Sequence, residues 1–172
     1  MNKIWITGAS SGIGKSLALR FANEGWQVAA SARRENLLNE ISKSNENIFS
    51  FPLDVTDSEK CKEVFYKIKE KFDEIDISVF CTGIHAPKSE KKLNLESIKK
   101  IMNVNFFGTI NSVNSVYEYY REKKSGHISI VSSVAGYRGL PAGGAYCASK
   151  AALTNYTESL YFDMKGLMSE AP

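Results

Sequence analysis

The sequence is poor in the residues that mark metal, disulfide and membrane proteins. It has 3 cysteines and 2 histidines among 172 residues, and Cys61, Cys81 and Cys147 are too far apart for a metal or redox motif. An odd number of scattered cysteines indicates a reducing compartment, so we expect a cytoplasmic protein. No apolar run reaches the ~18 residues of a membrane span, and the N-terminus enters an apolar strand without a signal peptide.

The sequence has little excess of positive over negative charge. The net charge is only +3, and lysine and arginine are interspersed among acidic residues, as on solvated helix faces. A nucleic-acid surface needs a denser basic patch, so this class of protein is excluded. His85 and His127 flank predicted strands and are assigned to solvated loops without a metal site. A length of 172 residues with 43% hydrophobic residues predicts one globular domain over residues 1–172.

What the chain does contain is a regular alternation of short apolar segments and longer amphipathic ones. Apolar residues recur at spacings of three and four in the longer segments, which is typical of helices. The alternation predicts an α/β protein with a doubly wound parallel sheet in three layers, α/β/α, and a ligand crevice at the carboxyl ends of its strands. The predicted strands are residues 3–7, 26–31, 48–54, 75–81 and 127–133. The predicted helices are residues 12–24, a short one around 37–41, one that begins after 56, 95–121, and one from about 141–146 to 165.

Two helix ends carry signals of their own. Thr56 and Glu59 have the spacing of a capping box, which predicts the start of the third helix. Gly166 is the predicted stop of the last helix. Both predictions concern how the unpaired backbone groups at helix ends find hydrogen-bond partners.

The stretch "ITGASSGIG", residues 6–14, joins the first predicted strand to the first helix. A helix N-terminus at the carboxyl edge of a sheet binds anions through free N–H groups and the helix dipole. Gly8 then permits the tight turn, Gly12 lets a pyrophosphate come close, and Gly14 lets the helix pack on the strand. Ser10 and Ser11 add hydroxyl donors. The alternative is a glycine-rich turn that holds no ligand, and the position after the first strand of an alternating pattern favours the dinucleotide.

The spacing G-x-x-x-G-x-G resembles the turn of the short-chain dehydrogenase/reductase family, whose members carry "TGxxxGxG" at this place. Four further segments resemble that family in the same order along the chain, so the resemblance extends from residue 3 to about 165. It implies a Rossmann-like nucleotide-binding domain and an oxidoreductase. The four segments are "LDVT" (53–56), "VNFFG" (104–108), "SSVAG" (132–136) and "AYCASK" (145–150).

The resemblance implies a catalytic site of four residues. Tyr146 and Lys150 are four apart on a predicted helix and share one face, so the lysine ammonium favours the phenolate and makes the tyrosine a workable acid or base. By resemblance, Ser133 holds the substrate oxygen, and Ser132 is the alternative whose side chain should point to the opposite face of the strand. Asn105, by resemblance, distorts the long helix and places a water that relays protons to Lys150.

The resemblance also implies a cofactor site along the strand ends. Ile13 belongs to the glycine turn, Asp54 would bond the adenine amino group, and Val55 would pack on the adenine ring. Gly83 lets the backbone approach the adenine ribose. Lys150 would hold the nicotinamide ribose hydroxyls beside Tyr146, so both residues belong to the cofactor site as well.

The end of the second strand predicts which nicotinamide cofactor binds. Ala32 stands where an NAD-preferring member usually has an acid, and Arg33 and Arg34 follow it. A guanidinium can hold a 2′-phosphate with two bonds, so we expect NADP(H), with NAD the less favoured cofactor. No basic residue stands at Ser11, where many NADP-binding members have one, and a solvated basic turn is the alternative.

The chain departs from the family pattern in two places. "FCTG" (80–83) replaces the usual "NNAG", so Phe80 and Cys81 are expected to support the site by packing. The family continues after the Tyr/Lys helix with two more strands and a substrate-covering segment, whereas this chain ends in "MKGLMSEAP". We therefore expect a domain without the family's last strands, which binds NADP(H) weakly and self-associates through the strand at 127–133.

The predicted function is the interconversion of an alcohol and a ketone or aldehyde by hydride transfer, with NADP(H) as cofactor. The substrate is a small carbonyl or alcohol, and neither nucleic acid nor membrane is an expected partner. The resemblance implies a homodimer or homotetramer formed through the helices at 106–120 and 146–165. The alternative is a truncated, catalytically impaired nucleotide-binding domain without turnover.

Overall fold

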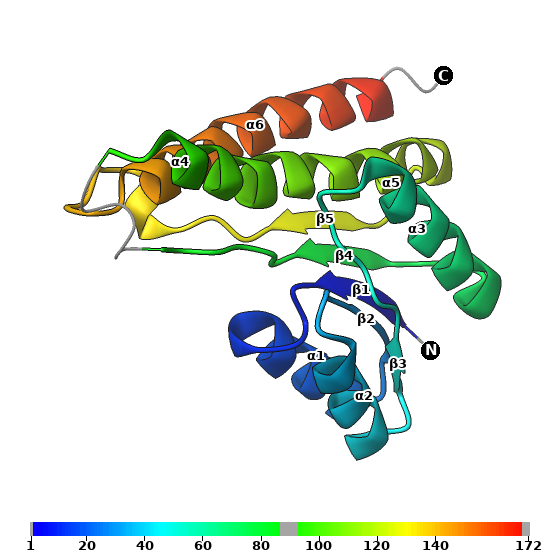
Figure 1. The fold of residues 1–172 in the computed structure, drawn as a ribbon. Helices are drawn as coiled ribbons and strands as arrows, with labels where there is room; N and C mark the ends of the chain where they lie inside the picture. The colour runs from blue at the N-terminus through cyan, green and yellow to red at the C-terminus, as the bar shows by residue number, and fades with distance from the viewer. Residues whose placement is uncertain (1, 87–92, 170–172) are drawn as a thin grey trace.

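Five parallel strands form one sheet in the order β3-β2-β1-β4-β5 (Figure 1). The computed structural model describes residues 2–86 and 93–169. The strand order reverses between β1 and β4, which places a ligand crevice outside the carboxyl ends of these strands. The predicted doubly wound α/β fold is confirmed. The strands are β1 (Lys3–Thr7), β2 (Gln27–Ser31), β3 (Ile48–Ser50), β4 (Ile77–Phe80) and β5 (His127–Ile130).

Helices cover the sheet on two sides and complete the three layers. Helices α1 and α2 lie on one face, while α3, α4, α5 and α6 lie on the other (Figure 1). Within the described part of the chain, no helix is both long enough and apolar enough to cross a membrane. The helices are α1 (Gly12–Asn23), α2 (Glu35–Ser44), α3 (Ser58–Phe72), α4 (Leu95–Met102), α5 (Gly108–Lys123) and α6 (Gly144–Ser169).

The two sides of the sheet have separate cores because side chains alternate along each strand. Ile4 and Ile6 point into the cluster under α1 and α2, whereas Trp5 between them points into the cluster under α3 and α5. Phe80 meets Trp5 edge to face, with ring centroids 5.6 Å apart. Phe80 is thus packed in the core and Cys81 packs on the opposite cluster, while their expected support of the site stays a prediction.

The long predicted helix over 95–121 is interrupted by a wider π-helical turn at Asn103–Phe107. Asn105 lies in this turn and is completely buried. The distortion expected at Asn105 is therefore present. π-Turns of this kind are frequently found at functional sites.

Two predicted helix ends are wrong. Helix α3 is capped by Asp57, whose side chain accepts a hydrogen bond from the Lys60 N–H at 2.9 Å, and the Thr56 hydroxyl instead donates to Asp54. The box proposed for Thr56 and Glu59 fails because the aspartate is the better-placed acceptor. Helix α6 continues past Gly166 to Ser169, since one glycine inside a helix costs only about 1 kcal/mol.

A buried hydrogen bond ties α5 to the centre of the sheet. The hydroxyls of Ser78 and Tyr120 are 2.9 Å apart, and both side chains are almost inaccessible to water. Burial also raises the pKa of Tyr120, so this hydroxyl stays protonated. We expect Tyr120→Phe to lower the free energy of unfolding by about 1–3 kcal/mol in urea denaturation, because Ser78 then has a buried hydroxyl without its partner.

Two further variants show whether the loss comes from that hydroxyl pair. Tyr66 lies on α3 with 63% of its surface exposed, so Tyr66→Phe should change stability by less than about 0.5 kcal/mol. Adding Ser78→Ala to Tyr120→Phe should recover part of the loss, since no unpaired hydroxyl is then buried. A double variant as unstable as the sum of the two single variants would contradict the pairing.

Candidate active site

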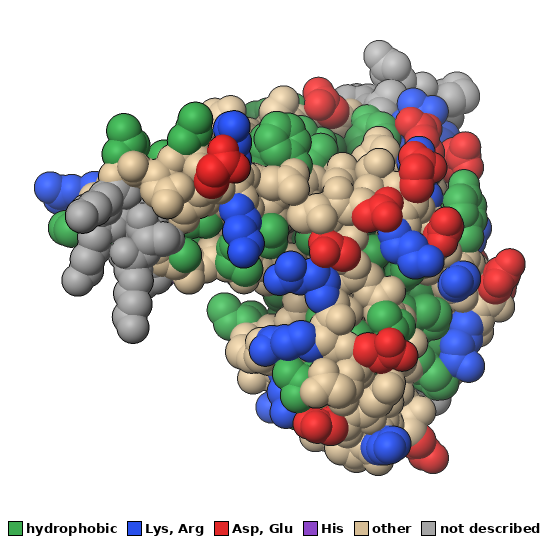
Figure 2. All heavy atoms as spheres, in the orientation of Figure 1, with side chains coloured by type: hydrophobic (Ala, Val, Ile, Leu, Met, Phe, Trp, Pro, Cys, Tyr) green, Lys and Arg blue, Asp and Glu red, His purple; other side chains and the backbone are tan. Residues whose placement is uncertain are grey.

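The surface is hollowed at the carboxyl end of the sheet, between α1 and the region of α4 and α6 (Figure 2). Every residue predicted for the site lies at this end of the sheet or on the helices beside it. The glycine turn follows β1, Arg33 and Arg34 follow β2, Asp54 and Val55 follow β3, Gly83 follows β4, Ser133 follows β5, Asn105 lies in the π-turn, and Tyr146 and Lys150 lie in the first two turns of α6.

The glycine turn needs its glycines for backbone conformation and for close packing. Gly8 and Gly12 have φ values of +70° and +55°, in the left-handed region that favours glycine. A Cβ atom on Gly14 would lie 2.5 Å from the Gly8 carbonyl oxygen, so α1 rests directly on the turn. A Cβ atom on Gly12 would meet nothing within 4 Å. The turn is therefore packed tightly on the protein side and open at Gly12.

The N-terminus of α1 has N–H groups available for an anion. Ser11 is the N-cap residue, and its side chain makes no capping hydrogen bond. The Arg34 guanidinium instead donates to the hydroxyls of Ser10 and Ser11, at 3.0 and 2.7 Å. A permanent positive charge thus stands beside an uncapped helix N-terminus, an arrangement that attracts phosphate groups.

Arg33 lies nearer to the end of β3. Its guanidinium is 4.0 Å from the Asp54 carboxylate, and both side chains are about half exposed. The other carboxylate oxygen of Asp54 accepts from the backbone N–H and the hydroxyl of Thr56. Val55 is buried, with its side chain against the position of Gly108. The predicted adenine contacts of Asp54 and Val55 stay predictions.

Lys150 is a buried amine at the centre of the site. Only 4% of its surface is exposed, and its Nζ donates to the Val131 carbonyl at 2.8 Å. The same nitrogen lies 5.9 Å from the centre of the Tyr146 ring. Burial lowers the pKa of Lys150, while the nearby Cys81 thiol acts in the opposite sense. The ammonium is therefore poorly hydrated and gains from any negative charge that forms near it.

Asn105 joins the β4 loop to α6. Its side-chain oxygen accepts from the Ile84 N–H at 2.7 Å, and its side-chain nitrogen donates to the Ile84 carbonyl at 2.9 Å and to the Ser149 hydroxyl at 3.1 Å. Ser149 in turn donates to the Tyr146 carbonyl at 2.7 Å. One amide thus holds both the loop after β4 and the turn of α6 that carries Tyr146.

The two serines after β5 have different surroundings. Ser132 donates to the Lys150 carbonyl at 2.9 Å and is 2.8 Å from the Thr154 hydroxyl, so it packs against α6. Ser133 is partly exposed, and its hydroxyl accepts from the Ala135 N–H at 3.2 Å. Ser132 is thus held by contacts with α6, and the predicted role of Ser133 at the substrate oxygen stays a prediction.

Comparison with known proteins identifies the family. The sequence model for short chain dehydrogenases matches residues 2–167. The chain belongs to the short chain dehydrogenase family. Members of this family are oxidoreductases, and the resemblance read from the glycine turn and the four further segments is confirmed at family level.

The chain is similar to individual members of the family and to solved structures. It is 31% identical to dehydrogenase/reductase SDR family member 7 of Mus musculus, over 94% of this chain and 50% of that protein. It is 34% identical to the 3-oxoacyl-[acyl-carrier-protein] reductase FabG of Thermotoga maritima, over 94% of this chain and 67% of that protein. The solved structure of ElxO with NADP bound matches with a TM-score of 0.88 at 28% identity, over 96% of this chain and 69% of that chain.

The chain spans about half to two thirds of the length of its first curated relatives. It covers 50% of the mouse protein and 65% of an uncharacterized oxidoreductase of Myxococcus xanthus. The residues matched include the glycine turn, the π-turn and the Tyr/Lys helix, because the match to the family runs from residue 2 to residue 167.

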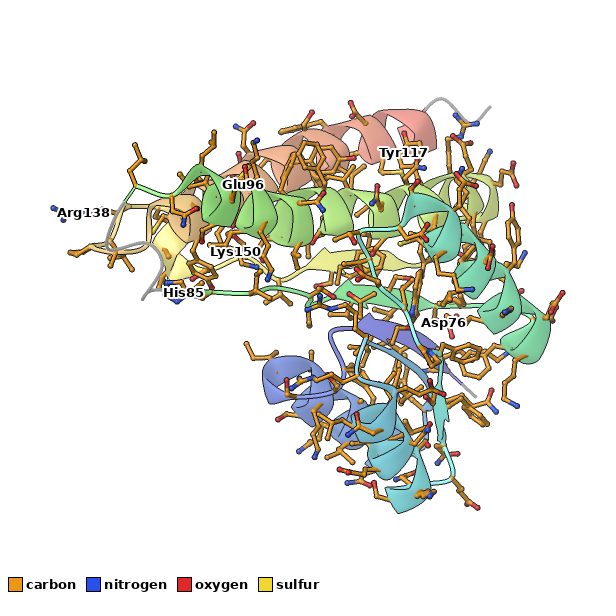
Figure 3. The ribbon with its side chains drawn as sticks, in the orientation of Figure 1. Asp76, His85, Glu96, Tyr117, Arg138 and Lys150 are labelled. Carbon is orange, nitrogen blue, oxygen red and sulfur yellow. The ribbon has the colours of Figure 1, made fainter. Side chains whose placement is uncertain are left out.

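One aromatic contact of the site was not predicted from the sequence. His85 is exposed, as expected, but its ring centroid lies 4.5 Å from that of Tyr146, and the two planes are tilted by 31°. Figure 3 shows His85 and Lys150 at the same end of the sheet. The position of His85 two residues after Gly83 was a usable signal, since that segment continues from the carboxyl end of β4.

Proposed function

We propose that this chain forms the cofactor-binding and catalytic part of an NADP(H)-dependent oxidoreductase that interconverts an alcohol and a ketone or aldehyde. The observation that carries the proposal is the buried Lys150, whose ammonium lies 5.9 Å from the Tyr146 ring at the carboxyl end of a parallel sheet. A buried, poorly hydrated cation next to a phenol stabilises the phenolate. Such a pair can move a proton to or from a substrate oxygen.

The residues around the pair have separate roles in carbonyl reduction. The reduced nicotinamide supplies the hydride when it is bound. Tyr146 gives its hydroxyl proton to the substrate oxygen as that oxygen gains charge, and in alcohol oxidation it takes the proton back. Ser133 donates a hydrogen bond to the same oxygen and holds it for attack at the carbonyl carbon. Asn105 would place the water that relays protons to Lys150, and Lys150 would also hold the nicotinamide ribose.

The turn after β1 fits the diphosphate of a dinucleotide. The open space at Gly12 and the uncapped N-terminus of α1 leave room and N–H donors for an anion, with Ile13 on the exposed side of that turn. Arg34 stands beside the turn on the hydroxyls of Ser10 and Ser11. Structures of similar proteins, among them ElxO, hold NADP, which supports the same cofactor here.

The selectivity for NADP(H) should depend on the two arginines after β2. We expect Arg34→Ala to weaken NADPH binding by about tenfold or more and to leave NADH binding nearly unchanged, because a charge-assisted bond to phosphate contributes ~1.5–3 kcal/mol. Arg33→Asp should have the same selectivity, since an acid there also repels the 2′-phosphate. Titration of each variant with both cofactors, followed by NADPH or NADH fluorescence, measures the difference.

Arg20 provides the matched control for the arginine variants. It lies on α1 in an exposed ion pair with Glu24, on the last turn of the helix and away from the glycine turn. Arg20→Ala should leave both affinities unchanged. An equal loss of NADPH and NADH affinity in Arg34→Ala would mean that this arginine supports the turn and does not bind the 2′-phosphate.

The expected partners of this site are a small carbonyl or alcohol and a second copy of the chain. The family resemblance implies subunit contact through α5, α6 and the π-turn. These elements carry three exposed aromatic side chains: Phe107 in the π-turn is 54% exposed, and Tyr161 and Phe162 in α6 are 59% and 68% exposed. Exposed aromatic side chains of this kind are typical of contact surfaces. The three cysteines are unpaired, which supports a reducing compartment such as the cytoplasm.

The direct test of the proposed function is NADPH consumption over a panel of ketones and aldehydes, together with NADPH titration of the same preparation. Turnover of at least one carbonyl supports the enzyme. NADPH binding without turnover of any carbonyl supports the alternative, a nucleotide-binding domain that does not catalyse. Absence of both would contradict the proposed cofactor site.

A further inference from the structure

The contact between His85 and Tyr146 lies on the residue that the proposed mechanism depends on most. The two ring centroids are 4.5 Å apart with a tilt of 31°, which is within the range of a stacked aromatic pair. Tyr146 is partly exposed on the first turn of α6, whereas His85 comes from the loop after β4. The pair therefore joins the loop after β4 to the first turn of α6.

The same network of hydrogen bonds fixes the backbone on both sides of this pair. Asn105 holds the N–H and the carbonyl of Ile84, the residue directly before His85. It also reaches Ser149, which donates to the Tyr146 carbonyl. One buried amide therefore ties together the two backbone segments that carry the rings.

A partly exposed tyrosine without a neighbour can rotate its ring away from a substrate. The backbone of Tyr146 is fixed by α6, but the direction of its hydroxyl depends on the side-chain torsions. A ring stacked on one face removes much of that freedom. General acid catalysis depends on the hydroxyl lying within hydrogen-bond distance of the substrate oxygen, and a misplacement of ~1 Å can cost 10²-fold in rate.

We propose that His85 is a positioning residue, which holds the ring of Tyr146 by stacking and so keeps the phenol hydroxyl aimed at the substrate oxygen. The inference rests on the proposed function, in which Tyr146 is the acid and base. His85 acts through Tyr146 and transfers no proton itself. The stacking surface is what matters, so another flat ring at position 85 should serve.

Kinetics of three variants test this role. We expect His85→Ala to lower kcat for carbonyl reduction by about tenfold and to leave the KM for NADPH within about twofold of the wild type. His85→Phe should restore most of kcat, because it keeps the ring and loses the imidazole nitrogens. His127→Ala, the matched control at the start of β5, should have wild-type kcat. A wild-type kcat in His85→Ala, or a kcat in His85→Phe as low as in His85→Ala, would overturn the proposal.

A measurement without turnover separates this inference from the proposed function. In protein with ¹³C-labelled tyrosine rings, the Tyr146 signal is assigned by its loss in Tyr146→Phe. Its relaxation should report an ordered ring in the wild type and in His85→Phe, and a mobile ring in His85→Ala. Equal ring order in all three would overturn the positioning role even if the enzyme is active. An ordered ring in a protein that turns over no carbonyl would instead reject the proposed function.

Discussion

Replacement of Tyr146 by phenylalanine should lower carbonyl reduction by at least about 10²-fold, while NADPH affinity changes little. The phenol oxygen is the group that moves the proton in the proposed reaction, and general acid–base groups contribute ~10²-fold to 10⁴-fold. The ring itself remains, so its contact with His85 and its place beside Lys150 are kept. Steady-state rates with the best carbonyl of the panel and NADPH titration of the same variant measure both quantities.

Tyr66→Phe is the matched control for this prediction. Tyr66 is an exposed tyrosine on α3, a helix that packs against α5. It is not among the residues predicted for the site. Removal of its hydroxyl should leave the rate unchanged. If Tyr146→Phe keeps more than about a tenth of the wild-type rate, another group supplies the proton and the role given to Tyr146 is wrong.

The second large effect should come from Gly14→Ala in the turn after β1. An added Cβ atom would lie 2.5 Å from the Gly8 carbonyl oxygen and 2.8 Å from the Gly8 carbonyl carbon, both of which are backbone atoms. Either α1 or the turn must shift to relieve the clash. We expect NADPH affinity to fall by at least about tenfold and the free energy of unfolding to fall by about 1–3 kcal/mol, as overpacking does elsewhere.

Gly139→Ala is the control for this substitution. A Cβ atom on Gly139 would meet nothing within 4 Å, and its φ value does not lie in the left-handed region. Both NADPH affinity and stability should therefore match the wild type within error. Unchanged NADPH binding in Gly14→Ala would show that the cofactor does not depend on the position of the α1 N-terminus.

The parts of the fold that follow from local patterns were predictable from the sequence. The alternation of apolar strands and amphipathic helices predicts the parallel sheet, and the spacing of Gly8, Gly12 and Gly14 predicts the turn after β1. The family segments predict the distortion at Asn105, which the π-turn contains. Each of these features depends on residues close together in the chain or on a motif of fixed spacing.

Contacts between segments that are distant in the sequence were harder to predict. The stacking of His85 on Tyr146 joins two residues that are far apart in the sequence, and no sequence periodicity links them. The different contacts of the two arginines also join distant segments, since Arg34 donates to Ser10 and Ser11 while Arg33 lies 4.0 Å from Asp54. Asp57 caps α3 although Thr56 and Glu59 have the spacing of a capping box, because the Thr56 hydroxyl is bonded to Asp54.

Hydride transfer under single-turnover conditions tests the central claim most directly. The 172-residue chain, in excess over NADPH that carries deuterium at its transferable position, is mixed with the carbonyl panel, and the alcohol product is analysed by mass spectrometry. We predict deuterium on the carbinol carbon with the wild-type chain and at least about 10²-fold slower transfer with Tyr146→Phe. Transfer at the same rate in both proteins, or tight NADPH binding with no deuterium in any alcohol, would contradict the account.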